Sequence, residues 1–311
     1  MKRRLLSFWV FLLIVNIILS GCGSSTAKNT AGTASGTPTP SEMPKDIAVV
    51  TDATLDIYKE PSTNSERVTQ ALYNQGVKVL AIKDSWSNVK AVDGYTGWVK
   101  TKSINFDCSS INASLYKYRI IITTKVKTIS TEFKGSFTAA TVVMGTEFYS
   151  NNEKDGWYEV YLPGGKKGWM DQSGCIRISA NERIPKTTPI DFIMTANKFT
   201  GSTYLWGGLS TYGIDCSGLT YICAKINGIE LPRDTQQQVQ LGEAVKDAKD
   251  MKPGDLVFFC SNDNRKNINH VGIYLGNNRY INASASRGSV TINSTDDIFF
   301  TTNLVGIRRI F

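Results

Sequence analysis

The chain has 311 residues, enough for two domains or for three small ones. Hydrophobic residues make up 41%, charged residues 20% and aromatic residues 10%, which excludes a fully disordered or collagen-like protein. The formal net charge is +8 and there is one histidine, so a His-rich metal cage and a mechanism with two imidazoles are excluded within this chain.

The first 21 residues have the features of a secretion signal. Lys2, Arg3 and Arg4 precede an almost wholly apolar run over residues 5–19, and Leu-Ser-Gly-Cys22 follows. This run is short for a transmembrane helix and typical of a signal peptide. The segment resembles a bacterial lipoprotein signal, which implies cleavage before Cys22 and a lipid on its thiol. We therefore expect an extracytoplasmic protein that is lipid-anchored to the bacterial cell membrane. The alternative is a plain signal peptide or signal anchor.

Residues 22–45 are rich in Ser, Thr, Gly, Ala and Pro, and they predict a flexible tether. The excess of positive charge suits an anionic cell wall or membrane surface, although solubility alone would explain it equally well. No basic cluster is interleaved with aromatic residues, so we expect no nucleic-acid partner.

A repeat with an offset of 71 residues follows. Each copy has two tryptophans 12 positions apart, with a glycine directly before the second. The pairs are Trp86 with Trp98 and Trp157 with Trp169. Short alternating segments bounded by turn residues surround each copy and predict strands. The offset is typical of tandem small domains, so we predict two small all-β barrels over residues 46–105 and 112–180. The pattern resembles bacterial Src-homology-3-like domains.

The six cysteines contain no C-x-x-C pair, so we predict neither a metal site nor a cofactor. A disulfide between Cys108 and Cys175 and a pair of free thiols both remain open at this point. Cys223 and Cys260 lie in apolar segments, which favours packing roles for both.

The spacing of apolar residues changes from residue 190 onward. Residues 190–199 and 216–227 have apolar positions at helical spacing. Residues 256–260, 270–275 and 279–284 predict consecutive strands. Helices followed by strands favour an α+β domain over residues 190–311.

Three polar residues of this domain form a candidate catalytic set. Cys216 lies where a Gly-rich loop meets the start of a predicted helix, a setting that favours the thiolate and lowers a thiol pKa to roughly 3.5–7.5. His270 begins a predicted strand and is the one imidazole available. Asn282 on the next strand could orient the ring, as in thiol proteases.

The motifs around these residues occur in a recognisable order. Asp215-Cys-Ser-Gly218 comes first, then Pro253-Gly-Asp-Leu-Val-Phe-Phe259, then His270-Val-Gly-Ile-Tyr-Leu-Gly276. The order resembles the NlpC family of papain-like cell-wall endopeptidases. The resemblance implies a papain-like α+β fold, Cys216 as nucleophile and His270 as base. It places Asn282 at a third position where many relatives have His, and Tyr204 near the oxyanion.

Two barrels before such a domain resemble one subgroup, the γ-D-glutamyl-diaminopimelate endopeptidases, which require a free L-Ala amine. The resemblance implies that Asp215 and Ser217 bind this amine, and that Thr235 stands where relatives carry Ser. It also implies that Glu60 and Tyr95 close the pocket. The structural alternatives are a helix cap for Asp215, a solvated turn for Glu60 and barrel packing for Tyr95.

We therefore expect a cysteine peptidase that cleaves the γ-D-Glu–diaminopimelate (or Lys) bond of peptidoglycan stem peptides. Two other classes remain open. One is a non-catalytic, wall-binding lipoprotein. The other stays within enzymes and comprises an endopeptidase that acts on intact stems, or an acyltransferase.

Overall fold

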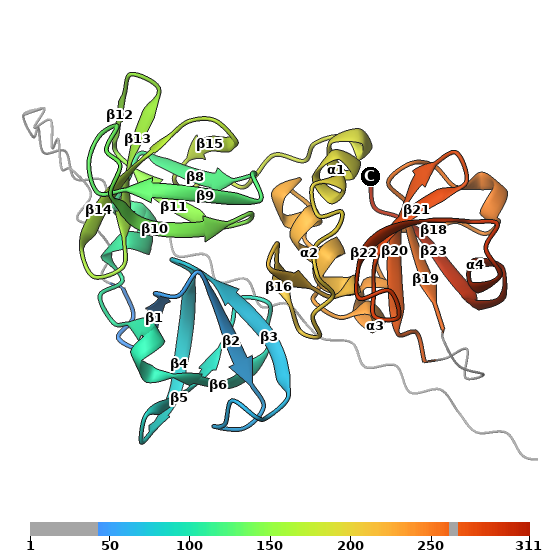
Figure 1. Cartoon of the computed structure of the whole chain (residues 1–311), viewed down its shortest axis with the longest axis horizontal. Helices are drawn as coiled ribbons and strands as arrows, with labels where there is room; N and C mark the ends of the chain where they lie inside the picture. Colours follow the sequence, from blue (N-terminus) through green and yellow to red (C-terminus); the bar gives the residue numbers. More distant parts are fainter. Residues whose placement is uncertain (1–42, 261–266) are drawn as a thin grey trace, which may run out of the picture. The chain divides into compact units, whose positions relative to one another are not determined.

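The computed structural model describes residues 43–260 and 267–311 (Figure 1). These residues all belong to one compact unit. The predicted signal peptide, Cys22 and residues 22–42 of the predicted tether lie outside the described residues. In the described part of the chain, no helix is both long enough and apolar enough to cross a membrane.

The N-terminal β-region is a seven-stranded antiparallel sheet with the order β3-β2-β6-β5-β4-β1-β7. Its strands are β1 (Ile47–Val50), β2 (Thr54–Tyr58), β3 (Arg67–Leu72), β4 (Gly76–Lys83), β5 (Trp86–Lys90), β6 (Thr96–Lys100) and β7 (Ile104–Asn105). Side chains alternate between the two faces of a strand. The apolar set, including Ile57, Val89 and Val99, is therefore fully buried on one side.

The middle β-region comprises two antiparallel sheets, ordered β10-β9-β14-β13-β12 and β11-β8-β15. Its strands are β8 (Tyr118–Ile122), β9 (Val126–Ser130), β10 (Thr138–Val143), β11 (Glu147–Ser150), β12 (Asn152–Lys154), β13 (Trp157–Leu162), β14 (Lys166–Asp171) and β15 (Cys175–Ser179). Side chains of both sheets, such as Ile129, Phe148 and Val160, pack into one shared core.

The sequence repeat is a structural repeat. β5 and β6 form a hairpin in which Trp98 pairs with Asn88, and β13 and β14 form one in which Trp169 pairs with Glu159. The glycine before the second tryptophan permits a close backbone approach in both copies. A Cβ on Gly97 would lie 2.5 Å from the carbonyl oxygen of Tyr58, and one on Gly168 would collide with Ile129. These glycines are therefore explained by packing.

The C-terminal region has short helices and a six-stranded antiparallel sheet with the order β18-β23-β19-β20-β21-β22. Its helices are α1 (Pro189–Asn197), α2 (Cys216–Ile226), α3 (Thr235–Gln238) and α4 (Ile298–Asn303). Its strands are β16 (Leu209–Ser210), β17 (Gly213–Ile214), β18 (Glu243–Ala244), β19 (Leu256–Phe259), β20 (His270–Gly276), β21 (Arg279–Ser284), β22 (Ser289–Ser294) and β23 (Leu304–Arg309). The short 3-10 helices before β8 are η1 (Thr101–Ser103), η2 (Ser109–Ile111) and η3 (Ala113–Leu115), and the C-terminal region contains η4 (Ala248–Asp250). The predicted helices and strands form within three residues of their expected bounds.

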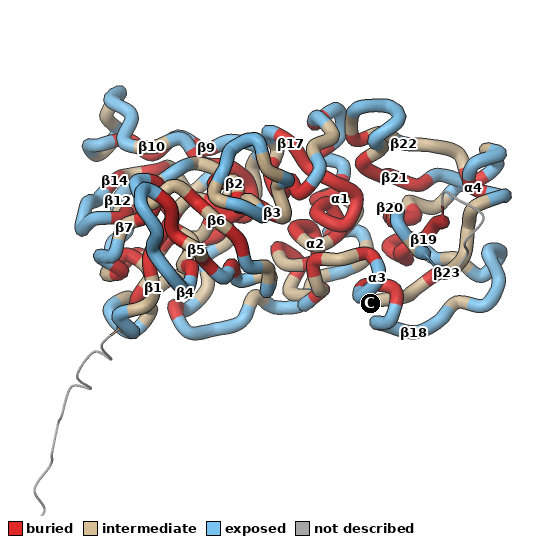
Figure 2. Tube along the Cα trace, turned by 90° about the horizontal axis from the view of Figure 1, so that it is seen from below, coloured by how far each residue is buried: buried red, intermediate tan, exposed pale blue. Residues whose placement is uncertain are grey.

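Helix α2 is the buried centre of this region (Figure 2). Its apolar side chains, including Leu219 and Ile222, share a core with Phe258 and Ile273 of the sheet. A helix fixed on several sides holds its first residue in a defined position. That residue is Cys216.

None of the five cysteines in the described part forms a disulfide. The disulfide that the sequence left open between Cys108 and Cys175 is therefore not formed. Cys108 donates from its sulfur to the carbonyl of Ile47 at 3.3 Å. Cys223 and Cys260 are buried, in agreement with their expected packing roles.

Candidate active site

Cys216 is the first residue of α2, and Asp215 caps the helix. The Asp215 carboxylate accepts a hydrogen bond of 2.7 Å from the N–H of Gly218, as a helix N-cap does. The Cys216 sulfur lies 4.0 Å from the carbonyl oxygen of Asn269 and meets the N–H of Val271. Asn269 and Val271 flank His270 in the chain, so the sulfur lies against the backbone that carries the imidazole.

His270 begins β20, and Asn282 on β21 contacts its ring. The distance from His270 Nε2 to Asn282 Oδ1 is 2.9 Å. Asn282 is 3% exposed, and its Nδ2 donates to Asn293 Oδ1 at 3.0 Å. Asn293 Oδ1 also accepts from the Thr291 hydroxyl at 2.9 Å. Because Asn282 Nδ2 is used as a donor, its oxygen must accept from His270 Nε2–H. This tautomer leaves Nδ1 of His270 as the proton acceptor.

Aromatic rings support the imidazole from two directions. The His270 ring centroid lies 5.6 Å from that of Phe259 on β19 and 6.1 Å from that of Phe299 on α4. Neither ring was singled out in the sequence. Their packing restricts the rotation of the imidazole and removes water from it.

Burial controls the protonation of both groups. It lowers the pKa of His270 below the usual 6.5, against the opposing hydrogen bond from Asn282. It raises the pKa of Cys216 to about 11, together with the charge of Asp215 and against the N–H of Val271 and the charge of Arg233. Desolvation of Cys216 therefore opposes the thiolate that the start of a helix was expected to favour.

Arg233 is a site residue that the sequence analysis missed. Its two terminal nitrogens donate to the two oxygens of Asp215 at 2.9 and 2.6 Å, and one of them also donates to Ser217 Oγ at 2.9 Å. Arg233 is 3% and Asp215 6% exposed. The sequence did contain a sign of such a partner. Asp215 stands at the start of an apolar helix, and a carboxylate that is buried there needs a cation.

This pairing uses the hydrogen-bonding capacity of Asp215. One oxygen accepts from Gly218 and the other from the N–H of Gly207 at 2.9 Å, in addition to Arg233. The cap expected for Asp215 is present, whereas its expected role as an amine ligand would use a carboxylate that is already neutralised. Ser217 lies in the same hydrogen-bonded cluster.

The N-terminal β-region reaches the site through Tyr95. Its hydroxyl donates to Asp234 Oδ1 at 2.6 Å. Burial and this hydrogen bond raise the pKa of Tyr95. Asp234 occupies the N-cap position of α3 without a side-chain capping hydrogen bond, and it stands between Arg233 and the buried Thr235. Tyr95 therefore lies next to the expected substrate-binding positions.

Glu60 stands on an exposed bend between β2 and β3, where its N–H donates to Ser65 Oγ at 3.1 Å. Other side chains of the N-terminal β-region contact the loop before α2. Arg67 donates to the carbonyl of Trp206 at 3.1 Å, and Gln70 accepts from the N–H of Leu209 at 2.8 Å. These two contacts were not expected from the sequence.

Tyr204 lies within electrostatic range of Cys216. Burial, followed by the charge of Cys216, raises the pKa of Tyr204 to about 12, so its hydroxyl stays protonated and can donate. Its N–H donates to the carbonyl of Gly288 at 2.8 Å, which fixes its backbone. Within the described residues, no cluster of three or more His, Cys, Asp or Glu forms a metal site.

Comparison with known proteins agrees with these features. Residues 201–309 match the NlpC/P60 family, and residues 57–104 match the bacterial dipeptidyl-peptidase Sh3 domain. The chain is 30% identical to a γ-D-glutamyl-L-lysine dipeptidyl-peptidase of Bacillus subtilis over 78% of this chain and 81% of that one. It is 28% identical to the enzyme of the same name from Bacillus cereus over 79% of this chain and 76% of that one.

A solved structure shares the fold. An NlpC/P60 family protein from Bacillus cereus superposes with a TM-score of 0.78 at 24% identity, over 85% of this chain and 99% of that one. The identity to the Bacillus subtilis relative, and the share of both chains that the match covers, show membership of the same family and not a shared fold alone. The chain belongs to the NlpC/P60 family of cysteine peptidases.

Proposed function

We propose that this protein hydrolyses peptidoglycan stem peptides at the γ-D-Glu–diaminopimelate (or Lys) bond by a Cys216–His270–Asn282 mechanism. The observation that carries the proposal is the geometry of His270. Its Nε2 is engaged by Asn282, and its backbone lies against the Cys216 sulfur. The relatives named γ-D-glutamyl-L-lysine dipeptidyl-peptidases support the choice of bond.

The chemistry follows from the tautomer. As the sulfur attacks the carbonyl carbon, its proton moves to Nδ1 of His270 and a C–S bond forms. N–H groups in the first turn of α2 and the hydroxyl of Tyr204 stabilise the oxyanion. The imidazolium then protonates the leaving amine as the C–N bond breaks. Water, deprotonated by His270, attacks the thioester, so that the C–S bond breaks and the thiol returns.

A thiol whose pKa is raised by burial is compatible with this sequence of steps. Charge forms on sulfur and imidazole together, as the proton moves between them, so neither ion is left alone in the buried site. Asn282 holds the ring while the charge changes. The site therefore operates by general-base activation of the thiol.

We further propose selection for a free N-terminal L-Ala. The word dipeptidyl-peptidase in the relatives' names supports it, because such enzymes release two residues from an amino end. Asp234 with Tyr95 supplies a carboxylate beside Thr235. The amine-binding roles of Asp215 and Ser217, the substrate-binding role of Thr235 and the pocket-closing role of Glu60 stay predictions. An N-acetylated substrate decides the point: unchanged cleavage after the amine is blocked would favour an endopeptidase of intact stems.

The architecture in this proposal is a papain-like α+β domain behind two Src-homology-3-like barrels. The seven-stranded sheet and the shared core of the two middle sheets support the barrels. A lipid on Cys22 would hold the mature protein at the outer face of the cell membrane, close to peptidoglycan. Metabolic labelling with a palmitate analogue, compared between the parent chain and Cys22→Ser, tests this anchor.

The direct test is cleavage of L-Ala-γ-D-Glu-diaminopimelate and of the corresponding Lys peptide by the purified chain. We expect release of the L-Ala-γ-D-Glu dipeptide, and a loss of about 10³-fold or more in kcat for Cys216→Ala. Cys223→Ala, which removes a buried thiol from the same helix, is the matched control and should retain activity. Equal cleavage by the parent chain and Cys216→Ala would refute the assignment.

One observation favours a second candidate, a non-catalytic wall-binding lipoprotein. It is the burial of Cys216, which is 8% exposed, because burial raises the pKa of the thiol and disfavours the thiolate. Iodoacetamide labelling, followed by mass spectrometry at each cysteine, separates the two. If His270 activates the thiol, Cys216 reacts much faster than buried Cys223, and His270→Gln abolishes the difference. Equal, slow labelling of both cysteines would favour the binding protein.

A further inference from the structure

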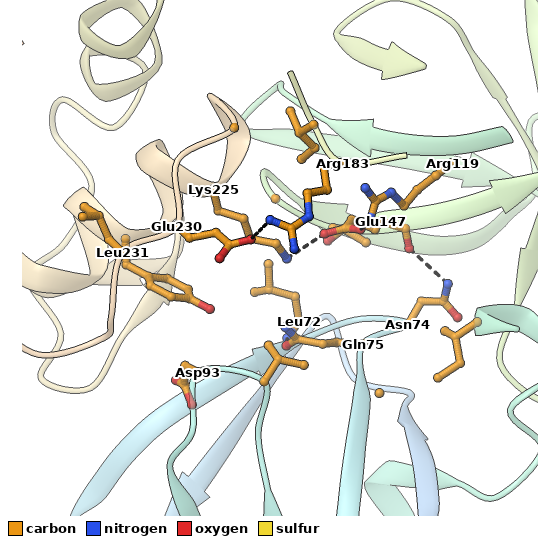
Figure 3. Close-up of a pocket in the computed structure, with 18 of the residues that line it drawn as sticks. Leu72, Asn74, Gln75, Asp93, Arg119, Glu147, Arg183, Lys225, Glu230 and Leu231 are labelled. Carbon is orange, nitrogen blue, oxygen red and sulfur yellow. Dashed lines mark hydrogen bonds and ion pairs between the residues drawn. The ribbon is translucent and has the colours of Figure 1, made fainter. Parts of the chain in front are cut away.

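The structure contains a cavity of about 740 Å³ whose lining does not include Cys216. Side chains of all three regions line it (Figure 3): Asn74 and Asp93 from the N-terminal β-region, Arg119 and Glu147 from the middle β-region, and Tyr221 and Lys225 from α2. Lys225 follows Cys216 by nine positions, which corresponds to about 13 Å along the helix axis. The cavity is within the size range of small-molecule sites.

One carboxylate in this cavity faces two cations. Glu147 Oε1 lies 2.7 Å from Lys225 Nζ, and Glu147 Oε2 lies 3.3 Å from the guanidinium of Arg119. The backbone carbonyl of Glu147 accepts from Asn74 at 3.0 Å. A single negative charge cannot balance both cations, so this wall carries an excess positive charge.

The other charges lining the cavity do not cancel this excess locally. Arg183 and Glu230 form their own pair at 3.2 Å, and their side chains are 89% and 86% exposed at the rim. Asp93 accepts from Thr69 and from the N–H of Tyr95. Figure 3 shows Asp93 on the side of the cavity away from Arg119.

Two buried polar atoms beside this positive wall lack a partner among the described residues. They are Arg119 Nε and Thr146 Oγ1, and Thr146 is 1% exposed. The terminal nitrogens of Arg119 are used by Glu147 and by the carbonyl of Glu182, so Nε–H is the donor left over. Buried donors normally have acceptors. Their placement next to two cations predicts an acceptor with negative charge.

The remaining walls suit a polar organic body. Three half-buried tyrosines line the cavity: Tyr73, Tyr149 and Tyr221. Tyrosine rings provide flat apolar faces with a hydroxyl at the edge. Gln75 and Asn74 add amide groups. A ligand with hydroxyl or amide groups on a compact body would find both kinds of contact.

We propose that this cavity binds a small organic carboxylate with a polar body, about the size of an acidic amino sugar or a dipeptide. Its carboxylate lies between Arg119 and Lys225, where a small side-chain shift would also make Arg119 Nε and Thr146 Oγ1 available as donors. Its body lies against the tyrosines. The site is separate from the cleavage site, so the proposal does not depend on the proposed peptidase activity.

The test is calorimetric titration of the full-length chain in detergent, carrying Cys216→Ala. Two pairs of ligands are compared. Ala-Ala and its C-terminal amide differ only at the carboxylate, and N-acetylmuramic acid differs from N-acetylglucosamine chiefly by a group that carries a carboxylate. We expect at least one acidic member to bind at least tenfold more tightly than its neutral counterpart. The pair that shows the difference identifies a sugar or a peptide source. No difference in either pair would overturn the proposal, whether or not the chain is a peptidase.

Variants locate the binding. Arg119→Gln and Lys225→Met should each weaken the acidic probe at least tenfold. Each leaves Glu147 with its other cation, so folding should persist, and the melting temperature checks this. Lys102→Gln, on an exposed turn of the N-terminal β-region, is the charge-matched control. Equal binding by all these chains would place the carboxylate elsewhere and overturn the proposal. If one variant fails to fold, the proposal is still tested by two measurements. These are the binding of the ligand pairs to the chain with Cys216→Ala alone, and the binding of the acidic probe to the other variant.

Discussion

The imidazole of His270 is oriented by neutral groups. Asn282 accepts from Nε2, and Asn293 with Thr291 holds the amide of Asn282 in that orientation. A neutral acceptor gives an imidazolium less support than a carboxylate would. Orientation is therefore the main contribution of Asn282, and it depends on a hydrogen-bond chain that ends on β22.

Substitution of Asn282 tests the role of orientation. We expect Asn282→Ala to lower kcat by about 10²-fold, because a misplaced ring delivers the proton poorly. Asn282→His restores a ring-orienting acceptor and should recover part of the loss. The measurement is steady-state hydrolysis of the tripeptide substrate. An unchanged kcat in Asn282→Ala would remove Asn282 from the mechanism.

The pKa of His270 predicts a pH dependence of stability. Its pKa in the folded protein lies below the usual 6.5, because burial disfavours the cation. As pH falls below 6.5, the unfolded chain takes up the proton first, so the free energy of unfolding decreases. The free energy of unfolding keeps its full value when the pH is well above 6.5. Urea unfolding at pH 5 and pH 7 measures this, and His270→Gln should remove part of the difference. Greater stability at pH 5 that disappears in His270→Gln would contradict the burial of a neutral imidazole.

At the scale of elements, the N-terminus of α2 depends on an ion pair between two separate segments. Arg233 precedes α3, and Asp215 caps α2. Both side chains are buried, so neither charge can be left without the other. The Arg233 guanidinium also donates to Ser217, the residue after Cys216. The position of Cys216 is therefore coupled to the loop before α3.

Removal of Arg233 tests this coupling. Arg233→Met leaves the Asp215 carboxylate buried without its cation, and we expect a loss of about 3–5 kcal/mol in the free energy of unfolding. Arg183→Met, which breaks an ion pair that is almost fully exposed, is the matched control and should cost less than about 1 kcal/mol. Urea unfolding measures both. Equal costs would mean that the buried pair is not a special support of α2.

At the scale of the whole molecule, the N-terminal β-region contributes directly to the candidate site. Tyr95 reaches Asp234, while Arg67 and Gln70 hold the loop before α2. Sites that need residues from two regions are typical where a ligand is bound between them. We therefore expect the β-region to influence substrate binding more than the chemical step.

Loss of the Tyr95 hydroxyl tests that expectation. Tyr95→Phe should raise KM about tenfold with little change in kcat, because a hydrogen bond to a carboxylate next to Thr235 is lost. Tyr116→Phe is the matched control, since it removes a tyrosine hydrogen bond, to the carbonyl of Ser109, within residues 109–116. A fall in kcat at constant KM would assign Tyr95 to the chemical step.

The sequence by itself determined the order of Cys216, His270 and Asn282, the repeated Trp and Gly pattern, and the helices and strands of the C-terminal region. These depend on local periodicity, on glycines at close approaches and on motif order, all of which are readable along the chain. Glu60 and Asp215 illustrate the limit. Motif matching predicted that Asp215 binds an amine and that Glu60 closes the pocket, and both roles stay predictions. It could not indicate that Arg233 pairs with Asp215 or that Glu60 stands on an exposed bend.

Tertiary structure alone decided the partners of the key side chains. The Asp215–Arg233 fork, the Tyr95–Asp234 hydrogen bond and the Asn293–Asn282 contact each join segments separated in sequence. It also decided that desolvation dominates the thiol of Cys216, since burial depends on everything packed around α2. Such contacts follow from long-range packing of the sheets against the helices, and single residues carry no local pattern that specifies them.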